Sequence, residues 1–333
     1  MPKSARQKLK PLYILEILRK YSDEENPLTA NEICELLEQE GISAERKSVY
    51  GDIDALCEYG YDIIRSFTPK RGFFLASREF EEAEIYLLCD AVRTAKFISP
   101  KKTRELVAKL DAILSKNQLQ HREKNIFFDS ELKCQNEEIY YNIDKISRAI
   151  LKSKQIKFYY TARKLSGRSI EKVVKEMRVS PYALTWQDDH YYLIGNYDKY
   201  DNLIHIRLDR ISGVEILDLK SRHFSLVSDY KDFFDVSDYK NKLFGMHSGE
   251  LETIELCCSK NIIEQVVDRF TENIFITNVT ENEFCFSYKA AISEALVTFI
   301  LNFGDNIKVL KPVSLQNMIK NRAEKVLNLY KNK

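Results

Sequence analysis

The sequence predicts a multidomain α+β protein, and three changes of hydrophobic pattern along the chain carry this prediction. Helical periodicity dominates residues 1–153, a period of two begins at Gln155, and strand and helix patterns alternate after residue 250. These two periodicities are the primary signals for amphipathic helices and half-buried strands. The chain's 333 residues are enough for two or three domains. The segments we expect are 1–77, 78–153, 154–222, 223–249 and 250–333, with 223–249 as a linker.

The first segment has the pattern of three helices followed by a hairpin. Residues 10–20 carry a wide apolar stripe, and residues 29–32 have the spacing of a capping box for the next helix. Gly41 suits the left-handed residue that ends this helix, and Ser43 is the expected N-cap of the third. Two short apolar runs joined by the basic turn 69–72 then predict a hairpin.

A helix, a tight turn and a second helix with a basic start are the arrangement that enters the DNA major groove. With the hairpin as its wing, the first segment is predicted to be a winged helix-turn-helix that binds double-stranded DNA. The residues expected to contact DNA are Arg46, Lys47, Ser48, Tyr50, Lys70 and Arg71. Residues 1–75 hold 11 basic and 13 acidic side chains. This net negative charge leaves open that the helix binds a protein instead.

Residues 78–153 are predicted to be a helical connector. Helical periodicity runs through residues 79–116 and returns at 139–152, on either side of a polar stretch at 117–136. Nothing in these residues suggests chemistry. We expect them to join the first segment to the rest of the chain, and they are candidates for a dimer contact.

The segment from Gln155 combines strand patterns with an excess of positive charge. Its five short strands are typical of a small antiparallel β-barrel. Residues 145–222 hold 16 basic and 9 acidic side chains, a net +7, whereas residues 1–75, 76–144 and 223–333 each carry a net −2. Arginines interleaved with tyrosines suit the clamping of phosphates and stacking on bases. A structural barrel with solvated charges is the alternative that the pattern leaves open.

Three runs in this segment resemble those of the WYL-domain transcriptional regulators. They are RVSPYAL at 178–184, HYYLIG at 190–195 and HIRLDRI at 205–211, in matching order and spacing. The tripeptide that names the family is YYL here, with Tyr where Trp is more frequent. The resemblance extends to residues 48–53 and the predicted wing. Residues 250–333 resemble the WCX extension that often follows such barrels.

The resemblance implies a winged helix-turn-helix, a helical connector, a small Sm/SH3-like β-barrel and a small C-terminal α+β domain. It also implies a cytoplasmic, bacterial homodimer that regulates transcription by binding a double-stranded operator. The barrel would sense single-stranded DNA, another oligonucleotide or a signalling nucleotide. The effector-binding residues carried over by motif position are Tyr159, Arg178, Tyr192, His205, Arg207 and Arg210. Asp209 is expected to orient an arginine and not to contact an anionic ligand.

No motif in the sequence predicts an enzyme, a cofactor or a metal site. The chain has no G-x-x-x-x-G-K-[ST] phosphate loop, no H-E-x-x-H and no G-x-S-x-G, and its five histidines show no ligand spacing. The alternative functions that we keep are a nuclease or other nucleic-acid-processing enzyme, and a module that binds protein through its helix-turn-helix.

The cysteines and the apolar runs indicate the compartment. The seven cysteines are scattered, with no C-x-x-C pair, which favours free thiols in a reducing cytoplasm. The N-terminus shows no uninterrupted apolar core of a signal peptide. No stretch approaches the ~18 apolar residues of a membrane span, so we expect no membrane partner.

Overall fold

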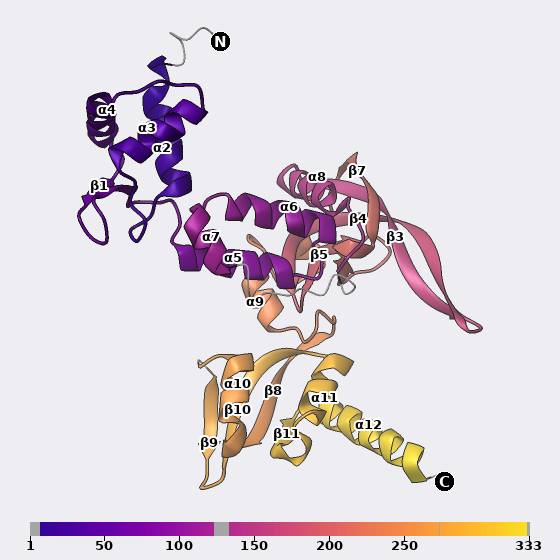
Figure 1. Cartoon of the computed structure of the whole chain (residues 1–333). Coiled ribbons are helices and arrows are strands. Elements are labelled where there is room, and N and C mark those ends of the chain that lie inside the picture. The colour runs from indigo at the N-terminus through magenta and orange to yellow at the C-terminus, as the bar shows by residue number, and fades with distance from the viewer. Residues whose placement is uncertain (1–6, 123–132, 273, 332–333) are drawn as a thin grey trace. The chain divides into compact units, whose positions relative to one another are not determined.

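The computed structural model of the chain describes residues 7–122, 133–272 and 274–331 (Figure 1). Contacts within the chain divide it into two compact units, residues 1–135 and 136–333. The first unit contains mainly helices with one small hairpin, and the second contains two larger antiparallel sheets together with helices. The expected mixture of helices and strands is confirmed.

Three helices and a short hairpin begin the first unit. They are α2 (Lys10–Tyr21), α3 (Ala30–Gln39), α4 (Arg46–Tyr59), β1 (Ile63–Ser66) and β2 (Gly72–Leu75). Thr29 and Glu32 form the expected capping box at the start of α3, and Gly41 has a φ of 77°. The N-cap of α4 is Glu45 and not Ser43, because the turn between α3 and α4 is longer than the pattern suggested.

The core of this region comes from the apolar positions that recur with helical spacing. Its fully buried side chains include Ile14, Leu18, Ile33, Leu37 and Val49. Removing each such side chain from water contributes about 1.5–3 kcal/mol to folding. The three helices are therefore held together by one shared apolar cluster.

Three more helices complete the described part of the first unit. They are α5 (Glu82–Thr94), α6 (Pro100–Asp111) and α7 (Lys116–Arg122). Ile85 and Cys89 of α5 pack in one cluster with Val107 and Leu114. Arg78 joins this cluster to the first three helices, because its guanidinium donates to the carbonyl of Ser22 at 2.7 Å and to that of Ile113 at 3.2 Å.

The second unit begins with α8 and an antiparallel five-stranded sheet. The elements are α8 (Ile139–Leu151), β3 (Lys154–Ser166), β4 (Ser169–Gln187), β5 (His190–Tyr197), β6 (Leu203–Arg207) and β7 (Ile211–Lys220). The strand order is β6-β5-β4-β3-β7. Phe158, Val179 and Leu193 are fully buried in the core of this sheet, and α8 packs against β7, β4 and β3.

The sheet is open, so the expectation of a closed barrel is wrong. Within residues 154–220, all of which are described, the edge strands β6 and β7 share no hydrogen-bonded ladder. The chain passes from β6 to β7 through the 3₁₀ turn Leu208–Arg210. The alternation of apolar residues predicted that this segment forms strands but not the bounds of each strand. Closure depends on which edges pair, and the pattern does not contain that information.

The segment between the two sheets packs against its neighbours. It contains a 3₁₀ turn, Phe224–Leu226, and a short helix, α9 (Val236–Asn241), which is capped by the Asp235 side chain. Phe234 and Tyr239 are buried here and lie in a network of aromatic rings. The rings in this network belong to Tyr182, Phe224, Tyr230, Phe234 and Tyr239.

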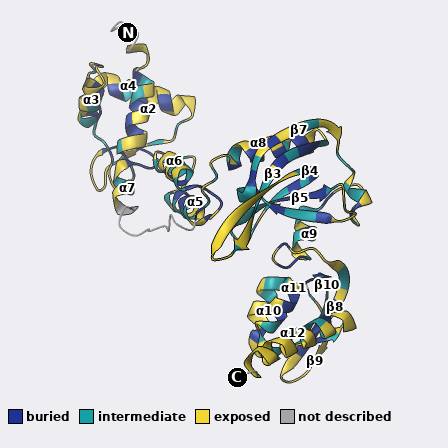
Figure 2. Ribbon diagram, turned by 90° about the vertical axis from the view of Figure 1, so that its right-hand side faces the viewer, coloured by how far each residue is buried: buried dark blue, intermediate teal, exposed yellow. Residues whose placement is uncertain are grey.

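A smaller α+β region ends the chain (Figure 2). It comprises β8 (Glu250–Ser259), α10 (Ile263–Phe270), β9 (Phe275–Val279), β10 (Glu283–Ile292), α11 (Glu294–Leu301), β11 (Ile307–Lys311) and α12 (Val313–Lys331). The antiparallel strand order is β11-β8-β10-β9. Leu256, Val266, Phe286 and Leu296 are fully buried in its core.

One disulfide corrects the expectation of seven free thiols. Cys257 on β8 and Cys285 on β10 are register partners on neighbouring strands, and they are joined by a disulfide. The linear sequence gave no sign of this pair, because 28 residues separate the two cysteines. Cys34, Cys57 and Cys258 are free thiols.

Two absences hold for the described residues. No described helix is both long enough and apolar enough to span a membrane. In the same part of the chain, no three or more His, Cys, Asp or Glu side chains are grouped so that they could hold a metal ion.

Candidate nucleic-acid and effector interfaces

A basic cleft lies beside the start of α4. It has a volume of about 190 Å³, and it brings together the N-terminus of α3, the first turns of α4 and both strands of the hairpin. The residues that line this basic cleft are Thr29, Ala30, Asn31, Arg46, Tyr50, Arg65, Arg71, Gly72 and Phe73. Three of them are arginines, and no lining residue is acidic.

Tyr50 is the point on which the three arginines of the basic cleft converge. Arg46 donates a hydrogen bond to the Tyr50 hydroxyl at 3.4 Å. The guanidinium of Arg65 lies 5.6 Å from the centroid of the Tyr50 ring. The hydrogen bond from Arg46, with the positive charges of Arg46, Arg65 and Arg71, lowers the pKa of Tyr50. The cleft is therefore a site of positive potential.

Arg65 is the residue of the basic cleft that sequence reasoning missed. It stands on β1, directly opposite Phe73 of β2, and not in the basic turn that drew attention to Lys70 and Arg71. Strand alternation could not have found it, because Arg65 shares a face of the hairpin with Ile63 and Phe73, which pack in the apolar cluster of the first three helices.

The other residues expected to contact DNA have different surroundings. Lys70 forms an ion pair with Glu32 at 2.8 Å. Partial burial would raise the pKa of Glu32, but hydrogen bonds from Lys70 and Thr29 outweigh it and lower the pKa. Ser48 accepts a hydrogen bond from Lys10, whereas Lys47 is exposed. The charge of Lys70 is thus partly neutralised by the Glu32 carboxylate on α3.

A second group of polar residues lies where β6 turns into β7. Arg207 donates two hydrogen bonds to the Asp209 carboxylate, from Nε at 3.0 Å and from Nη2 at 2.7 Å. Arg210 donates from Nη1 to the Tyr160 hydroxyl at 3.2 Å. Tyr192 is the register partner of Arg207 on β5. We refer to Tyr160, Tyr192, Arg207, Asp209 and Arg210 as the effector cluster.

The electrostatics of the effector cluster favour an anion. The hydrogen bonds with Asp209 raise the pKa of Arg207, which remains charged. Burial raises the pKa of Tyr192, so its hydroxyl remains a neutral donor. Asp209 orients an arginine, as expected from the sequence. Because Asp209 engages Nε and Nη2 of Arg207, Nη1 is left to donate to a ligand.

Three of the residues expected to bind the effector lie outside these contacts. Tyr159 precedes Tyr160 on β3, so it points to the opposite face of the sheet, where its ring lies beside Gly213. Arg178 lies 3.8 Å from Asp198 in a separate cleft of about 560 Å³. His205 is hydrogen-bonded to Tyr239 at 3.0 Å. The structure therefore groups Tyr192, Arg207 and Arg210, and it adds Tyr160, which the sequence did not single out.

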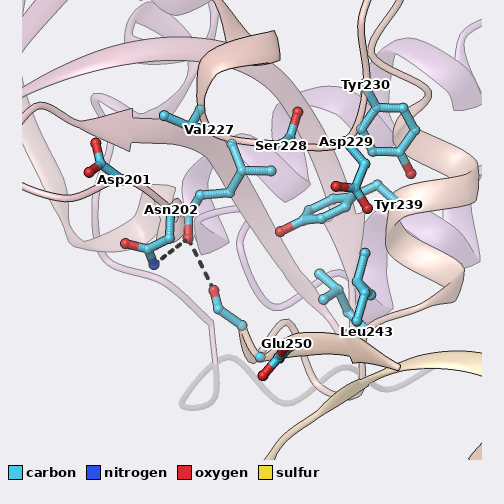
Figure 3. Close-up of a pocket in the computed structure, with 13 residues that line it drawn as sticks. Asp201, Asn202, Val227, Ser228, Asp229, Tyr230, Tyr239, Leu243 and Glu250 are labelled. Atoms are coloured by element: carbon cyan, nitrogen blue, oxygen red, sulfur yellow. Dashed lines mark hydrogen bonds between the residues drawn. The ribbon is translucent and has the colours of Figure 1, made fainter. Parts of the chain in front are cut away.

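A further cavity, of about 630 Å³, lies between the β5–β6 connection, the segment around α9 and the start of β8 (Figure 3). Its lining includes the carboxylates of Asp201, Asp229 and Glu250 and the ring of Tyr239. The backbone carbonyl of Leu203 accepts hydrogen bonds at its edge. Three carboxylates and no arginine or lysine in the lining make this cavity unsuited to a phosphate.

Comparison with protein families places these features in named domains. Residues 141–216 match the WYL domain, and residues 250–327 match the WCX domain. The chain carries a WYL domain and a WCX domain. The expectation of these two domains is confirmed, and the whole effector cluster lies within the WYL domain.

Comparison with individual proteins adds little detail. No curated protein matches the chain. Among solved structures, proteasome accessory factor B/C (PafBC) of Arthrobacter aurescens is 15% identical with a TM-score of 0.29, over 96% of this chain and 48% of that chain. The chain therefore spans about half the length of that protein. A CRISPR Cas-related protein is 13% identical with a TM-score of 0.36, over 99% of this chain and 85% of that chain.

Proposed function

We propose that the protein is a DNA-binding transcription regulator that acts by binding and not by catalysis. In this proposal α2, α3, α4 and the β1–β2 hairpin form a winged helix-turn-helix that binds a double-stranded operator. The WYL domain binds a nucleic-acid or nucleotide effector. The observation that carries the proposal is the basic cleft at the start of α4, in a chain that also contains a WYL domain.

The chemistry of the basic cleft supports contact with the DNA backbone. Arg46 lies in the first turn of α4, where a recognition helix approaches base edges and phosphates. Arg65 and Arg71 come from the hairpin, and a guanidinium donates two parallel hydrogen bonds to a phosphate. The first segment carries a net negative charge, so its affinity for DNA would come from these few placed arginines.

The chemistry of the effector cluster supports a phosphate-containing ligand. Arg207 and Arg210 would donate to the phosphate, and the rings of Tyr160 and Tyr192 would stack on a base. Single-stranded DNA, another oligonucleotide and a signalling nucleotide all share this chemistry. Binding would change operator affinity only if the effector prefers one of two conformations of the protein.

We further propose that the protein works in the bacterial cytoplasm as a homodimer. A two-fold dimer would bind two half-sites related by symmetry, as other helix-turn-helix regulators do. The competing function is a nuclease. Incubation of the pure protein with labelled single- and double-stranded DNA and magnesium distinguishes the two, because cleavage would overturn the proposal.

The test of the DNA-binding surface is a titration of the duplex upstream of the protein's own gene, followed by fluorescence anisotropy. Arg46→Ala and Arg65→Ala should each weaken binding. Each should also reduce the slope of log K against log[salt] by about 1, which corresponds to one lost phosphate contact. Arg19→Ala also removes one positive charge from the first unit, but Arg19 lies outside the basic cleft and pairs with Glu16. If Arg19→Ala weakens binding as much as Arg65→Ala does, the cleft is not the DNA-binding surface.

A further inference from the structure

The pairing of β3 with β4 extends well beyond the five-stranded sheet. The two strands pair from Ile156 opposite Val179 to Ser166 opposite Ser169. On one side, β7 pairs with β3 only as far as Tyr160, and on the other side β5 pairs with β4 only from Val179 onward. Residues 161–175 therefore form a two-stranded ribbon without a third strand, which projects from the sheet in Figure 1. We call these residues the ribbon arm.

The ribbon arm carries much of the positive charge of residues 145–222. Its single acidic residue is Glu171, and its basic residues are Arg163, Lys164, Arg168, Lys172 and Lys175. All five basic side chains are exposed. Within the described residues none of them forms an ion pair, although Lys175 lies 5.6 Å from the Tyr197 ring. The excess charge thus lies largely outside the effector cluster.

The register of the ribbon arm concentrates unbalanced charge on one face. Arg163 lies directly opposite Lys172, and like charges at facing positions of a β-ribbon are destabilising. On the same face, the next pair toward the tip is Leu165 with Ile170, which are 72% and 71% exposed. On the other face Lys164 lies opposite Glu171 and Lys175 lies opposite Tyr160, so the net charge of that face is +1, compared with +2 on the Arg163–Lys172 face. Within the ribbon arm, the Arg163–Lys172 face carries no acidic side chain, and no other strand covers its apolar side chains.

We propose that the ribbon arm binds double-stranded DNA through its Arg163–Lys172 face. The major groove of B-DNA accommodates a two-stranded β-ribbon. Phosphates on the groove walls would neutralise the facing cations, and release of their counterions would provide affinity without sequence preference. Leu165 and Ile170 at the tip could then contact thymine methyl groups. The residues of this face belong neither to the basic cleft nor to the effector cluster.

The test uses the full chain and a short duplex of random sequence, titrated over a range of salt concentrations. The double variant Arg163→Ser/Lys172→Ser should lower affinity about tenfold at low salt and reduce the slope of log K against log[salt] by about 2. The matched control is Lys152→Ser/Lys220→Ser. It also removes two exposed cations, but they lie near the opposite end of β3 from the ribbon arm.

Three outcomes would overturn the inference. The first is wild-type affinity and slope in the arm variant, and the second is an equal loss in the matched control. The third is a change in oligomeric mass without a change in DNA affinity, which would assign the arm to a second copy of the chain. A thermal melt within a few degrees of wild type shows that the exposed substitutions leave the fold intact.

The inference and the proposed DNA-binding function can fail separately. If Arg65→Ala loses DNA affinity and the arm variant does not, the winged helix-turn-helix binds DNA and the ribbon arm does not. If only the arm variant loses DNA affinity, the ribbon arm binds DNA and the basic cleft does not. A larger loss for single-stranded than for double-stranded DNA in the arm variant would also overturn the inference, because the proposed ligand is a duplex.

Discussion

His205 is the single residue with the most distinctive environment. Tyr239 and Ser248 contact its two ring nitrogens at 3.0 Å and 3.3 Å. Burial lowers its pKa to about 4, and the nearby His247 acts in the same direction, although a hydrogen bond with the backbone of Met246 acts against it. His205 is therefore neutral in the folded protein at pH 7. His205 lies in the contact between β6 and α9.

This environment predicts a dependence of stability on pH. Above pH 6.5 His205 is neutral in both states. Between pH 6.5 and about 4 the unfolded chain takes up a proton that the folded chain does not, so the free energy of unfolding should fall by about 3 kcal/mol as the pH decreases. Denaturation at several pH values compares the wild type with His205→Gln, whose curve should be flatter. Parallel curves for the two proteins would contradict the assignment.

At the scale of elements, the junction between β4 and β5 depends on Gly195. A Cβ at this position would lie 2.6 Å from the carbonyl oxygen of Ser180 and 2.8 Å from Cγ1 of Val179. Both atoms belong to β4, the register partner of β5, and a backbone carbonyl within a ladder cannot move aside without disturbing the pairing. The close approach of the two strands therefore requires glycine here.

Gly195→Ala should destabilise the second unit by about 1–3 kcal/mol. Trp186, the only tryptophan, lies on β4, so denaturation followed by its fluorescence reports on this sheet. The matched control is Gly51→Ala within α4, where a Cβ would have no neighbour within 4 Å. It should be neutral or stabilising by up to about 1 kcal/mol. An unchanged free energy of unfolding in Gly195→Ala would show that β4 and β5 can move apart without loss of stability.

At the scale of the whole molecule, the proposed regulator must couple an effector site in the second unit to a DNA site in the first. Arg207→Ala/Arg210→Ala should abolish binding of a fluorescent oligonucleotide and its effect on operator affinity. Operator affinity without effector should remain measurable. Arg178→Ala is the control, because Arg178 pairs with Asp198 in a different cleft. Loss of effector binding in Arg178→Ala, with retention in the double variant, would move the site to that cleft.

Reciprocity provides a second readout of the same coupling. If the oligonucleotide changes operator affinity by some factor, the operator must change oligonucleotide affinity by the same factor. Titrations in both orders on the wild-type protein measure this factor. A factor of one in both orders would show that the two sites are not coupled.

Patterns within a few residues of each other were sufficient for much of this protein. The capping box of Thr29 and Glu32 and the presence of strands within residues 154–220 follow from local spacing, and the WYL and WCX domains follow from the resemblance of short motifs to known families. The pairing of Asp209 with Arg207 was also predictable, since the two residues are close in the sequence. Hydrophobic periodicity and capping act over one or two turns, so the sequence displays them directly.

Contacts between distant residues were decided only when the chain folded. The hydrogen bond from Arg210 to Tyr160, the ion pair of Lys70 with Glu32 and the disulfide of Cys257 with Cys285 join residues 28 to 50 positions apart. The open edge between β6 and β7 and the unsupported length of the ribbon arm depend likewise on strand order and register. The composition revealed an excess of positive charge in the central block. The length of the ribbon arm, which carries much of this charge, follows from where the neighbouring strands stop pairing.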